Sequence, residues 1–379
     1  MFHPNLRSLT TLFAASAIAA LTLAPAANAA GDPVASGQFD LAFSPAFKKQ
    51  LKAKRTWVRA RGVSIETGSV DPVGGAASLK LSGSLKFQHR DKTVVFENLS
   101  ATLGPDGALE ASMLNHHGAG KRAVTTLFQL SEGSVAREGF GANVSGVQAS
   151  LAPSGAARLG RRLGVRLPIG NAGSLAVYTQ PETVAVVSGL ATVTQDLSPG
   201  GIAPKLRAHC IDPDGGVTPS GAATKPAPGN FLIPVAGGTI SPTGWIAGKV
   251  DLAGGLDVTV GGPGLPAGCP TSVVATIHFA NFAVDVAHTS VLTDLTVGGP
   301  YSPFGNTVIP VELQGSTANA TMVADPSNHS LTASGAQLGL DQVSAQMMNN
   351  LLPHASGGSI PSFNAGDLLG SADMTVQTR

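Results

Sequence analysis

Apolar and polar residues alternate with a period of two over many short stretches of the chain. Residues 93–99 (TVVFENL) and 273–279 (VVATIHF) are two such stretches, and both mix β-branched with aromatic residues. Turn-forming residues separate them, as in residues 71–75 (DPVGG) and 104–107 (GPDG). Short alternating segments between turns are typical of the strands of a sandwich or barrel. The pattern therefore predicts a mainly β protein.

Two segments have the spacing of a helix instead. Ser44 and Pro45 precede an apolar segment at residues 46–51 as an N-cap and a first-turn proline would, which predicts a helix there. Near the C-terminus, helical spacing relates Leu340, Val343, Met347 and Leu351. This second spacing predicts an amphipathic helix that lies on the sheet.

An ordered set of short motifs occurs twice along the chain, which indicates a duplicated unit. Residues 36–41 are echoed by 188–193, 83–87 by 248–252, 96–101 by 279–284, 147–163 by 336–352, and Gly173-Ser174 by Gly370-Ser371. Copy one is predicted over residues 36–187 and copy two over residues 188–379. Copy two is longer because of a Pro/Gly-rich insertion at 212–230 and a cysteine-bearing insertion at 261–270. We expect two tandem sandwich-like or barrel-like β domains, each with one or two short helices packed on the sheet.

The first 29 residues have the features of a signal peptide. Arg7 supplies the positive charge, residues 12–23 form a short apolar core, and Ala27-Asn28-Ala29 offers a cleavage site. The apolar core is shorter than the roughly 20 residues that cross a membrane. No later stretch suggests a transmembrane anchor, so we expect an exported protein, secreted or associated with the cell envelope.

Cysteine use agrees with export. The chain contains two cysteines, Cys210 and Cys269, both beyond the predicted signal peptide. Two cysteines in an exported protein most simply form one disulfide. We therefore predict a Cys210–Cys269 bond.

Composition excludes several classes of protein. Charged residues make up 12% of the chain, and Gly and Pro number 47 and 26, which argues against a coiled coil or a long helical bundle. The net charge of +1 gives no global field for nucleic acid. Motifs of nucleophilic-serine hydrolases, zinc peptidases and nucleotide-binding loops are absent from the sequence. The vicinal pair His116-His117 would point to opposite faces of a strand, so it predicts no metal site. We expect a protein without catalytic activity, catalytic residues or a bound metal.

Charge is divided unevenly between the copies. Copy one has 18 basic and 10 acidic residues, whereas copy two has 5 basic and 12 acidic residues. A possible basic contact face comprises Lys48, Lys49, Lys52, Lys54, Arg55, Arg59 and Arg61. Such a face suits anionic cell-wall polymer, phospholipid headgroups or the propionates of haem. Docking of the two copies, or a solvated helix face, explains the same charges.

The order of these motifs resembles the HtaA-type domain of exported and surface proteins of actinobacteria, some of which bind haem. In copy one the resemblance rests on residues 83–89 and Asn98, and in copy two on residues 248–256 and Asn281. It covers nearly all of the chain beyond the signal peptide. It implies an exported β domain and offers haem as a ligand.

In haem-binding members of that family, an early Tyr and a His at the end of the Gly-x-x-x-Phe-x-His strand form the site. Copy one retains the His as His89, but the Tyr position falls near Gln50, and in copy two Gly254 occupies the His position. His89 is thus either half of a haem site or an exposed hairpin histidine. The two tyrosines, Tyr178 and Tyr301, are the remaining phenol ligands for iron or ordinary structural residues.

Two functions follow from the sequence. The first is an exported, non-enzymatic binding module that captures or transports haem at the cell envelope. The second is a structural or interaction protein of the cell wall or surface, with anionic wall polymer or an envelope protein as its partner. Nucleic acid is not expected, because aromatic residues are not interleaved with the basic stretch.

Overall fold

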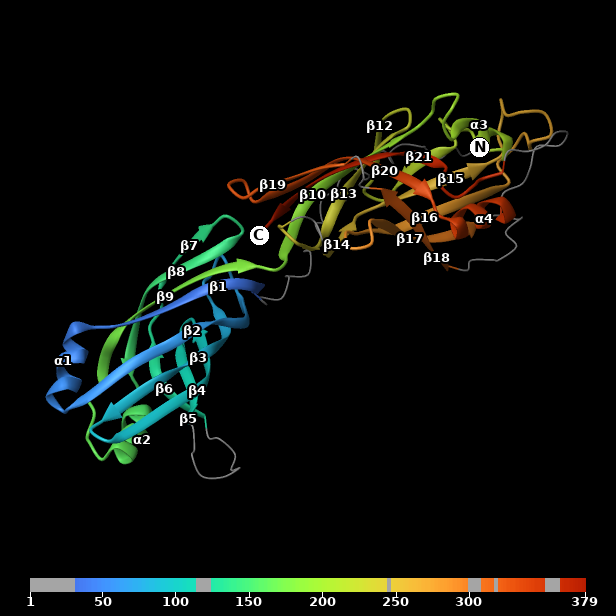
Figure 1. Ribbon diagram of the computed structural model, residues 1–379. Helices are drawn as coiled ribbons and strands as arrows, with labels where there is room; N and C mark the ends of the chain where they lie inside the picture. The colour runs from blue at the N-terminus through green and yellow to red at the C-terminus, as the bar shows by residue number, and fades with distance from the viewer. Residues whose placement is uncertain (1–30, 114–123, 244–246, 299–307, 317–319, 352–361) are drawn as a thin grey trace, which may run out of the picture. The chain divides into compact units, whose positions relative to one another are not determined.

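The structure is a computed structural model that describes residues 31–113, 124–243, 247–298, 308–316, 320–351 and 362–379 (Figure 1). The signal peptide predicted at 1–29, the pair His116-His117 and Tyr301 lie outside the described residues. Among the residues that are described, no helix is both long enough and apolar enough to cross a bilayer.

Antiparallel strands form the first sheet, in the order β6-β5-β4-β3-β2-β1-β9-β8-β7. Its strands are β1 (Asp32–Phe43), β2 (Thr56–Val70), β3 (Ala77–His89), β4 (Lys92–Leu103), β5 (Ala108–Met113), β6 (Val124–Leu130), β7 (Ser134–Glu138), β8 (Gly141–Leu151) and β9 (Gly170–Pro181). Strand β6 also pairs with β8, and this pairing closes eight of the strands into a barrel. The helices of this part are α1 (Pro45–Ala53) and α2 (Pro153–Leu163).

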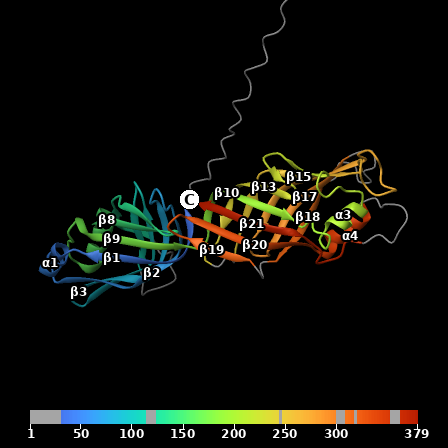
Figure 2. The ribbon, with the colours of Figure 1, turned by 90° about the horizontal axis from the view of Figure 1, so that it is seen from above.

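The second sheet follows the order β11-β15-β16-β14-β13-β10-β21-β20-β18-β17. Its strands are β10 (Val184–Gln195), β11 (Val217–Ser220), β12 (Thr224–Ala227), β13 (Asn230–Ile240), β14 (Gly248–Leu252), β15 (Gly255–Val260), β16 (Ala275–Asp285), β17 (Ser290–Gly298), β18 (Val308–Ser316), β19 (Thr321–Asp325), β20 (Ser330–Leu340) and β21 (Leu368–Thr378). Pairing of β16 with β17 closes this sheet as well. Strand β12 pairs with β13, and β19 pairs with β20, outside this order. Its helices are α3 (Ala203–Ala208) and α4 (Gln342–Leu351), as Figure 2 shows from a second direction.

Both sheets place their elements in the same order. In each, the first strand lies beside the last, a helix follows the first strand, and another helix precedes the last strand. Irregularities also correspond: the first strand has a bulge before Ser36 in one sheet and before Ser188 in the other. Asn98 and Asn281 both have left-handed backbone conformations, with φ of 49° and 54°. The two barrels therefore share one strand order and one placement of helices; the predicted break at 187/188 falls inside β10.

Paired glycines permit close approach of the first and last strands in each barrel. A Cβ on Gly37 or Gly189 would lie 2.3 Å from a carbonyl oxygen of the last strand. A Cβ on Gly173 or Gly370 would lie 2.0 Å from a carbonyl oxygen of the first strand. No larger residue fits at these positions without moving backbone, so the Gly-Ser motifs predicted to mark the repeat have a packing function.

The two barrels are packed differently inside. One continuous cluster fills the first barrel and includes the buried rings of Phe39, Phe47, Phe87, Phe96 and Phe128. In the second barrel, the buried side chains divide between two clusters, one around Ile233, Val250 and Val376, the other beneath α3 and α4. The second barrel therefore lacks a single continuous core.

The fold prediction is confirmed as mainly β, and its units are barrels rather than sandwiches. The predicted first helix is α1, whose N-cap Ser44 accepts a hydrogen bond from the Phe47 amide at 3.1 Å. The prediction for the last helix is wrong about which residues form its buried face. Leu340 ends β20, so α4 begins only after it, and Val343 faces solvent with 71% of its surface exposed.

Candidate ligand cavity in the second barrel

A cavity of about 260 Å³ lies inside the second barrel. Strands on several sides contribute its apolar wall, which includes Phe231, Ile233, Ile277, Phe279, Leu338 and Met374. Helices α3 and α4 add Leu206, Met347 and Met348. A space lined in this way suits an apolar molecule, because burial of apolar surface is the main source of affinity in such sites.

Small residues at the first and last strands explain part of the space. The repeated motif aligns Ala191 on β10 with Phe39 on β1, and Ala372 on β21 with Leu175 on β9. Phe39 and Leu175 are 4% and 2% exposed in the filled first barrel. Ala191 and Ala372 line the cavity. A ring and an isobutyl group are therefore absent from the corresponding wall.

The neighbouring strand contributes two further reductions in size. Strands β8 and β20 have a register shift at the same place, between Val144 and Val147 in β8 and between Ala333 and Ala336 in β20. Both valines are buried in the first barrel, and both alanines line the cavity. The side-chain truncations thus lie on three adjacent strands, β10, β21 and β20.

Two polar side chains of the wall have an oxygen with no hydrogen-bond partner among the described residues. They are Ser290, which is 2% exposed, through Oγ, and Gln195 through Oε1. A buried polar atom without a partner is costly, so a ligand that bonds to it gains affinity. Other polar groups of the wall are occupied within the protein: Ser344 Oγ donates to the Glu312 carbonyl at 2.9 Å, and Asp373 Oδ1 accepts from the Gly335 amide at 2.6 Å.

A charged pair lies at the turn between β16 and β17. Asp285, which lines the cavity, accepts a hydrogen bond at Oδ2 from His288 Nδ1 at 2.8 Å. This hydrogen bond lowers the pKa of Asp285 and raises the pKa of His288. The strand register places Asp285 level with the start of β10, whereas α3 follows the end of β10. The pair therefore lies at the end of the barrel opposite to α3 and α4.

The charge of the wall restricts its ligand. Among the described residues that line the cavity, the ionisable ones are Asp285 and Asp373, and none is Lys, Arg or His. A carboxylate or phosphate buried inside would meet no counter-ion and would lose its hydration. The described wall therefore disfavours an anion, and its apolar majority suits an uncharged molecule.

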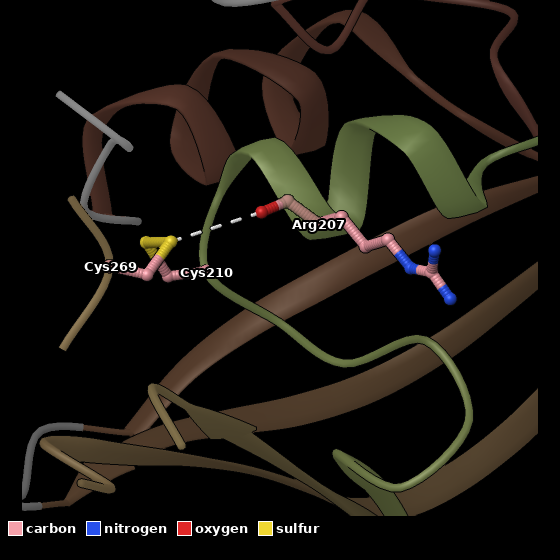
Figure 3. The surroundings of a disulfide bond; sticks show 3 residues. All are labelled: Arg207, Cys210 and Cys269. Atoms are coloured by element: carbon pink, nitrogen blue, oxygen red, sulfur yellow. Dashed lines mark hydrogen bonds between the residues drawn. A yellow bond between two sulfur atoms is a disulfide. The ribbon is translucent and has the colours of Figure 1, made fainter. Parts of the chain in front are cut away.

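The disulfide predicted from the sequence is confirmed, and it lies at the α3 end of this barrel (Figure 3). The Cα atoms of Cys210 and Cys269 are 5.4 Å apart, and Cys269 Sγ lies 4.0 Å from the Arg207 carbonyl oxygen. The Gly261 amide also donates to the Cys210 carbonyl at 2.7 Å. The bond joins the segment after α3 to the insertion at 261–270.

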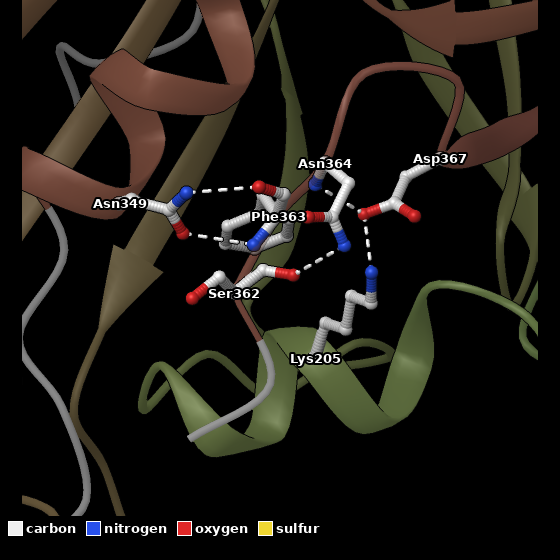
Figure 4. A network of polar contacts seen from close by, with 6 residues as sticks. All are labelled: Lys205, Asn349, Ser362, Phe363, Asn364 and Asp367. Carbon is white, nitrogen blue, oxygen red and sulfur yellow. Dashed lines mark hydrogen bonds and ion pairs between the residues drawn. The ribbon is translucent and has the colours of Figure 1, made fainter. Parts of the chain in front are cut away.

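Polar contacts tie the same end together (Figure 4). The Asn349 side chain of α4 donates to the Phe363 carbonyl at 2.9 Å and accepts from its amide at 2.8 Å. Asp367 accepts from the Asn364 amide at 2.8 Å and pairs with Lys205 of α3. The Phe363 ring is buried and stacks on His209. Two helices and the 362–367 segment thus close this end as one unit, which we call the cap.

The histidine of the predicted haem site lies in the first barrel, away from the cavity. His89 ends β3 and is half-buried, and its Nδ1 lies 3.1 Å from the Thr56 hydroxyl. Gln50, at the predicted tyrosine position, is exposed on α1. Gly254, at the histidine position of copy two, lies between β14 and β15 with φ of 114°.

The structure does not bring Tyr178 to His89. Val34 pairs with Pro181, which places the end of β9 near the Val70 end of β2, whereas His89 pairs with Thr56 at the other end of β2. The Tyr178 hydroxyl accepts a hydrogen bond from Gln180 at 3.0 Å. No group of three or more His, Cys, Asp or Glu side chains converges within the part of the chain that is described.

The solved structures that are similar to this chain include domains of HtaA. The C-terminal domain of HtaA from Corynebacterium glutamicum is 15% identical, with a TM-score of 0.31, and covers 39% of this chain and 98% of its own. The N-terminal domain is 14% identical, with a TM-score of 0.29, and covers 51% of this chain and 99% of its own. At these scores the likeness to HtaA supports no conclusion about a ligand. No protein-family model and no curated protein matches the sequence.

Sequence reasoning missed the cavity, although its signal was present. The echo of residues 36–41 in 188–193 already set Ala191 against Phe39. The sequence was searched for residues that bind iron, and the side-chain volumes of the two copies were not compared. A residue-by-residue comparison of volumes between the copies is the observation that could have indicated a hollow second barrel.

Proposed function

We propose that this chain is an exported, non-enzymatic binding protein that holds an uncharged, apolar small molecule inside its second barrel. The observation that carries the proposal is the apolar cavity of about 260 Å³ in a barrel whose sister barrel is filled. Export is supported by the signal-peptide features of residues 1–29. A binding function follows more directly from such a cavity than a purely structural one, because an empty apolar space lowers stability.

The proposed ligand has an apolar body and a hydrogen-bonding group. The apolar wall binds the body, and one buried oxygen without a partner among the described residues accepts from a hydroxyl or amide: Ser290 Oγ at one end of the barrel or Gln195 Oε1 at the other. A long-chain alcohol has this chemistry, whereas the matching fatty acid adds a charge that no basic side chain of the described wall would neutralise. We therefore expect alcohols to bind more tightly than carboxylates of equal length.

Displacement of a fluorescent apolar probe, N-phenyl-1-naphthylamine, from the full exported chain tests the proposal. We expect 1-hexadecanol to displace the probe more effectively than palmitate, and affinity to rise roughly tenfold for each two added methylenes until the cavity is full. Ala191→Phe and Ala372→Leu should each abolish probe binding by filling the wall. Ala324→Phe, at an exposed position of β19, is the matched control and should bind normally. Unchanged probe binding in Ala191→Phe would overturn the proposal.

Haem is the second candidate, and the orientation of His89 favours it. The Thr56 hydroxyl at Nδ1 fixes the imidazole and leaves Nε2 as the nitrogen for iron. Titration with hemin separates the two sites. A Soret shift that His89→Ala abolishes and Ala191→Phe preserves would place haem at the first barrel. A shift with the opposite sensitivity would place it in the cavity. If neither hemin nor the apolar probe binds, the alternative of a structural or interaction protein is favoured.

A further inference from the structure

One end of the first barrel has a strongly basic surface. Three segments contribute to it: residues 44–57, residues 89–92 and residues 153–169. Together they contain eleven basic residues and a single acidic one, Asp91. The exposed members are Lys48, Lys49, Lys52, Lys54, Arg55, Arg90, Lys92, Arg161, Arg162 and Arg166, and we call them the basic end.

The fold, rather than the sequence order, brings these segments together. Thr56 pairs with His89, and His89 pairs with Lys92, so the residues after α1 lie beside the β3–β4 turn. A Cβ on Gly164, the C-cap of α2, would lie 3.3 Å from Lys92 Nζ, so α2 ends beside the same turn. Figure 1 shows α1 and α2 at the same end of this barrel.

Two of the arginines occupy backbone positions that disfavour them. Arg55 and Arg90 have φ of 51° and 52°, in the left-handed region where Gly or Asn is less strained. The helices likewise carry no acidic residue in their first turns, where one would be stabilising. These residue choices do not optimise folding stability. They point to a requirement for positive charge at this surface.

Exposed apolar side chains accompany the charges. Trp57, directly after the α1 segment, is 52% exposed, and Ile169, between α2 and β9, is 65% exposed. A soluble polyanion would bind through the Lys and Arg side chains alone and would not need exposed apolar side chains. Trp and aliphatic side chains beside Lys and Arg are typical of proteins that bind at the interface of a lipid bilayer.

We propose that the basic end docks on an anionic lipid bilayer. Lys and Arg side chains would contact the phosphate groups of the lipid headgroups, while Trp57 and Ile169 enter the interfacial region. This inference depends only on the first barrel and is independent of the cavity and its ligand. The alternative occupant, an anionic wall polymer, shares the phosphate chemistry but offers no apolar phase for Trp57 and Ile169.

Co-sedimentation of the full exported chain with lipid vesicles tests the proposal. We expect binding to vesicles of phosphatidylcholine with phosphatidylglycerol in a ratio of three to one, and none to phosphatidylcholine alone. Each basic residue near an anionic surface contributes about a fivefold gain in binding. The double variant Lys48→Gln/Lys52→Gln should therefore bind on the order of twentyfold more weakly. A control variant, Thr67→Glu/Thr102→Glu, makes the same change in net charge at exposed positions toward the other end of the barrel and should bind nearly normally.

A second pair of variants separates lipid from polymer. Trp57→Ser/Ile169→Ser should weaken binding to the anionic vesicles at least tenfold and leave binding to soluble polyphosphate unchanged. The proposal is overturned if this variant binds vesicles normally, because the cations alone would then account for the interaction and a polymer would be the fitting partner. It is also overturned if the charge variant and its control bind equally.

Discussion

The first and second barrels share a strand order and bulge positions, yet one is filled and the other is hollow. The first barrel buries Phe39 and Leu175 where the second has Ala191 and Ala372. Backbone irregularities survive in both, so the difference lies in side-chain volume and not in architecture. Two barrels with the same strand order can thus differ in whether their interior is filled, through the volume of a few inward side chains.

The largest expected effect is from truncation of the ring that fills the first barrel. Phe39→Ala should lower the unfolding free energy of that barrel by about 3–5 kcal/mol, because a buried ring is lost and a cavity remains. Hydrogen exchange of the full chain, read by mass spectrometry, reports the two barrels separately. Ala191→Phe, the converse change, should not destabilise the second barrel. Equal destabilisation by both changes would contradict the view that only one barrel has space.

Removal of the disulfide should affect only the hollow barrel. Cys210→Ser/Cys269→Ser should lower its unfolding free energy by about 2–4 kcal/mol, since the bond restricts the unfolded chain across a separation of 59 residues. Denaturant unfolding with and without reductant measures this difference in the parent protein. The first barrel contains no cysteine and serves as the internal control. A loss of protection in the first barrel would show that the two do not unfold independently.

Each barrel has an asparagine in the left-handed conformation at the corresponding position, and replacement of either should destabilise its barrel. Asn98→Ala and Asn281→Ala should each cost about 1–2 kcal/mol, because alanine tolerates left-handed conformation poorly. Glycine at either position should restore most of the loss. Asn281 also donates to Asp294 at 2.9 Å, so its alanine variant should be the more damaging of the two. Chemical denaturation of the four single variants tests the ranking.

The smallest effect concerns the exposed pair at the β16–β17 turn, which has no counterpart in the first barrel's Gly-Pro-Asp-Gly turn. The raised pKa of His288 contributes stability below its ordinary value of 6.5, and this contribution is lost as pH rises through the raised pKa. The lowered pKa of Asp285 contributes stability above its ordinary value of 3.8, and this is lost as pH falls through the lowered pKa. The pair should therefore stabilise the second barrel mainly between those two values.

Nuclear magnetic resonance titration of His288 measures this coupling. In Asp285→Asn, the pKa of His288 should fall back toward its ordinary value. Added salt should weaken the coupling in the parent protein, because both groups lie near solvent. An unchanged His288 titration in the variant would show that the hydrogen bond does not determine its pKa.

Local rules were sufficient to predict much of the architecture. Ser44 and Pro45 marked the start of α1, and alternation with turn residues marked a mainly β fold. The presence of two cysteines, together with the prediction of export, was enough to predict their bond. The helix start and the strands depend on residues close together in the sequence, and two cysteines can form only one intramolecular disulfide. The phase of α4 was wrong because the apolar spacing ran across the boundary between β20 and the helix.

The candidate sites were harder to predict because they depend on which distant residues meet. Tyr178 and His89 both have suitable iron-binding chemistry, but strand register separates them. Ser290 and Gln195 are ordinary in sequence and become notable only as buried oxygens without partners among the described residues. The basic residues were visible as a run at 48–61, whereas the contribution of Arg90, Lys92 and α2 required the folded barrel.

The cap bears on how the molecule proposed for the cavity would exchange with its surroundings. A covalent bond and the contacts of Asn349 and Asp367 cross-link the described elements at that end of the hollow barrel. For the molecule proposed above, the cross-linked end is then expected to be the slower route of exchange, and the opposite end, where Asp285 and His288 lie, the faster one.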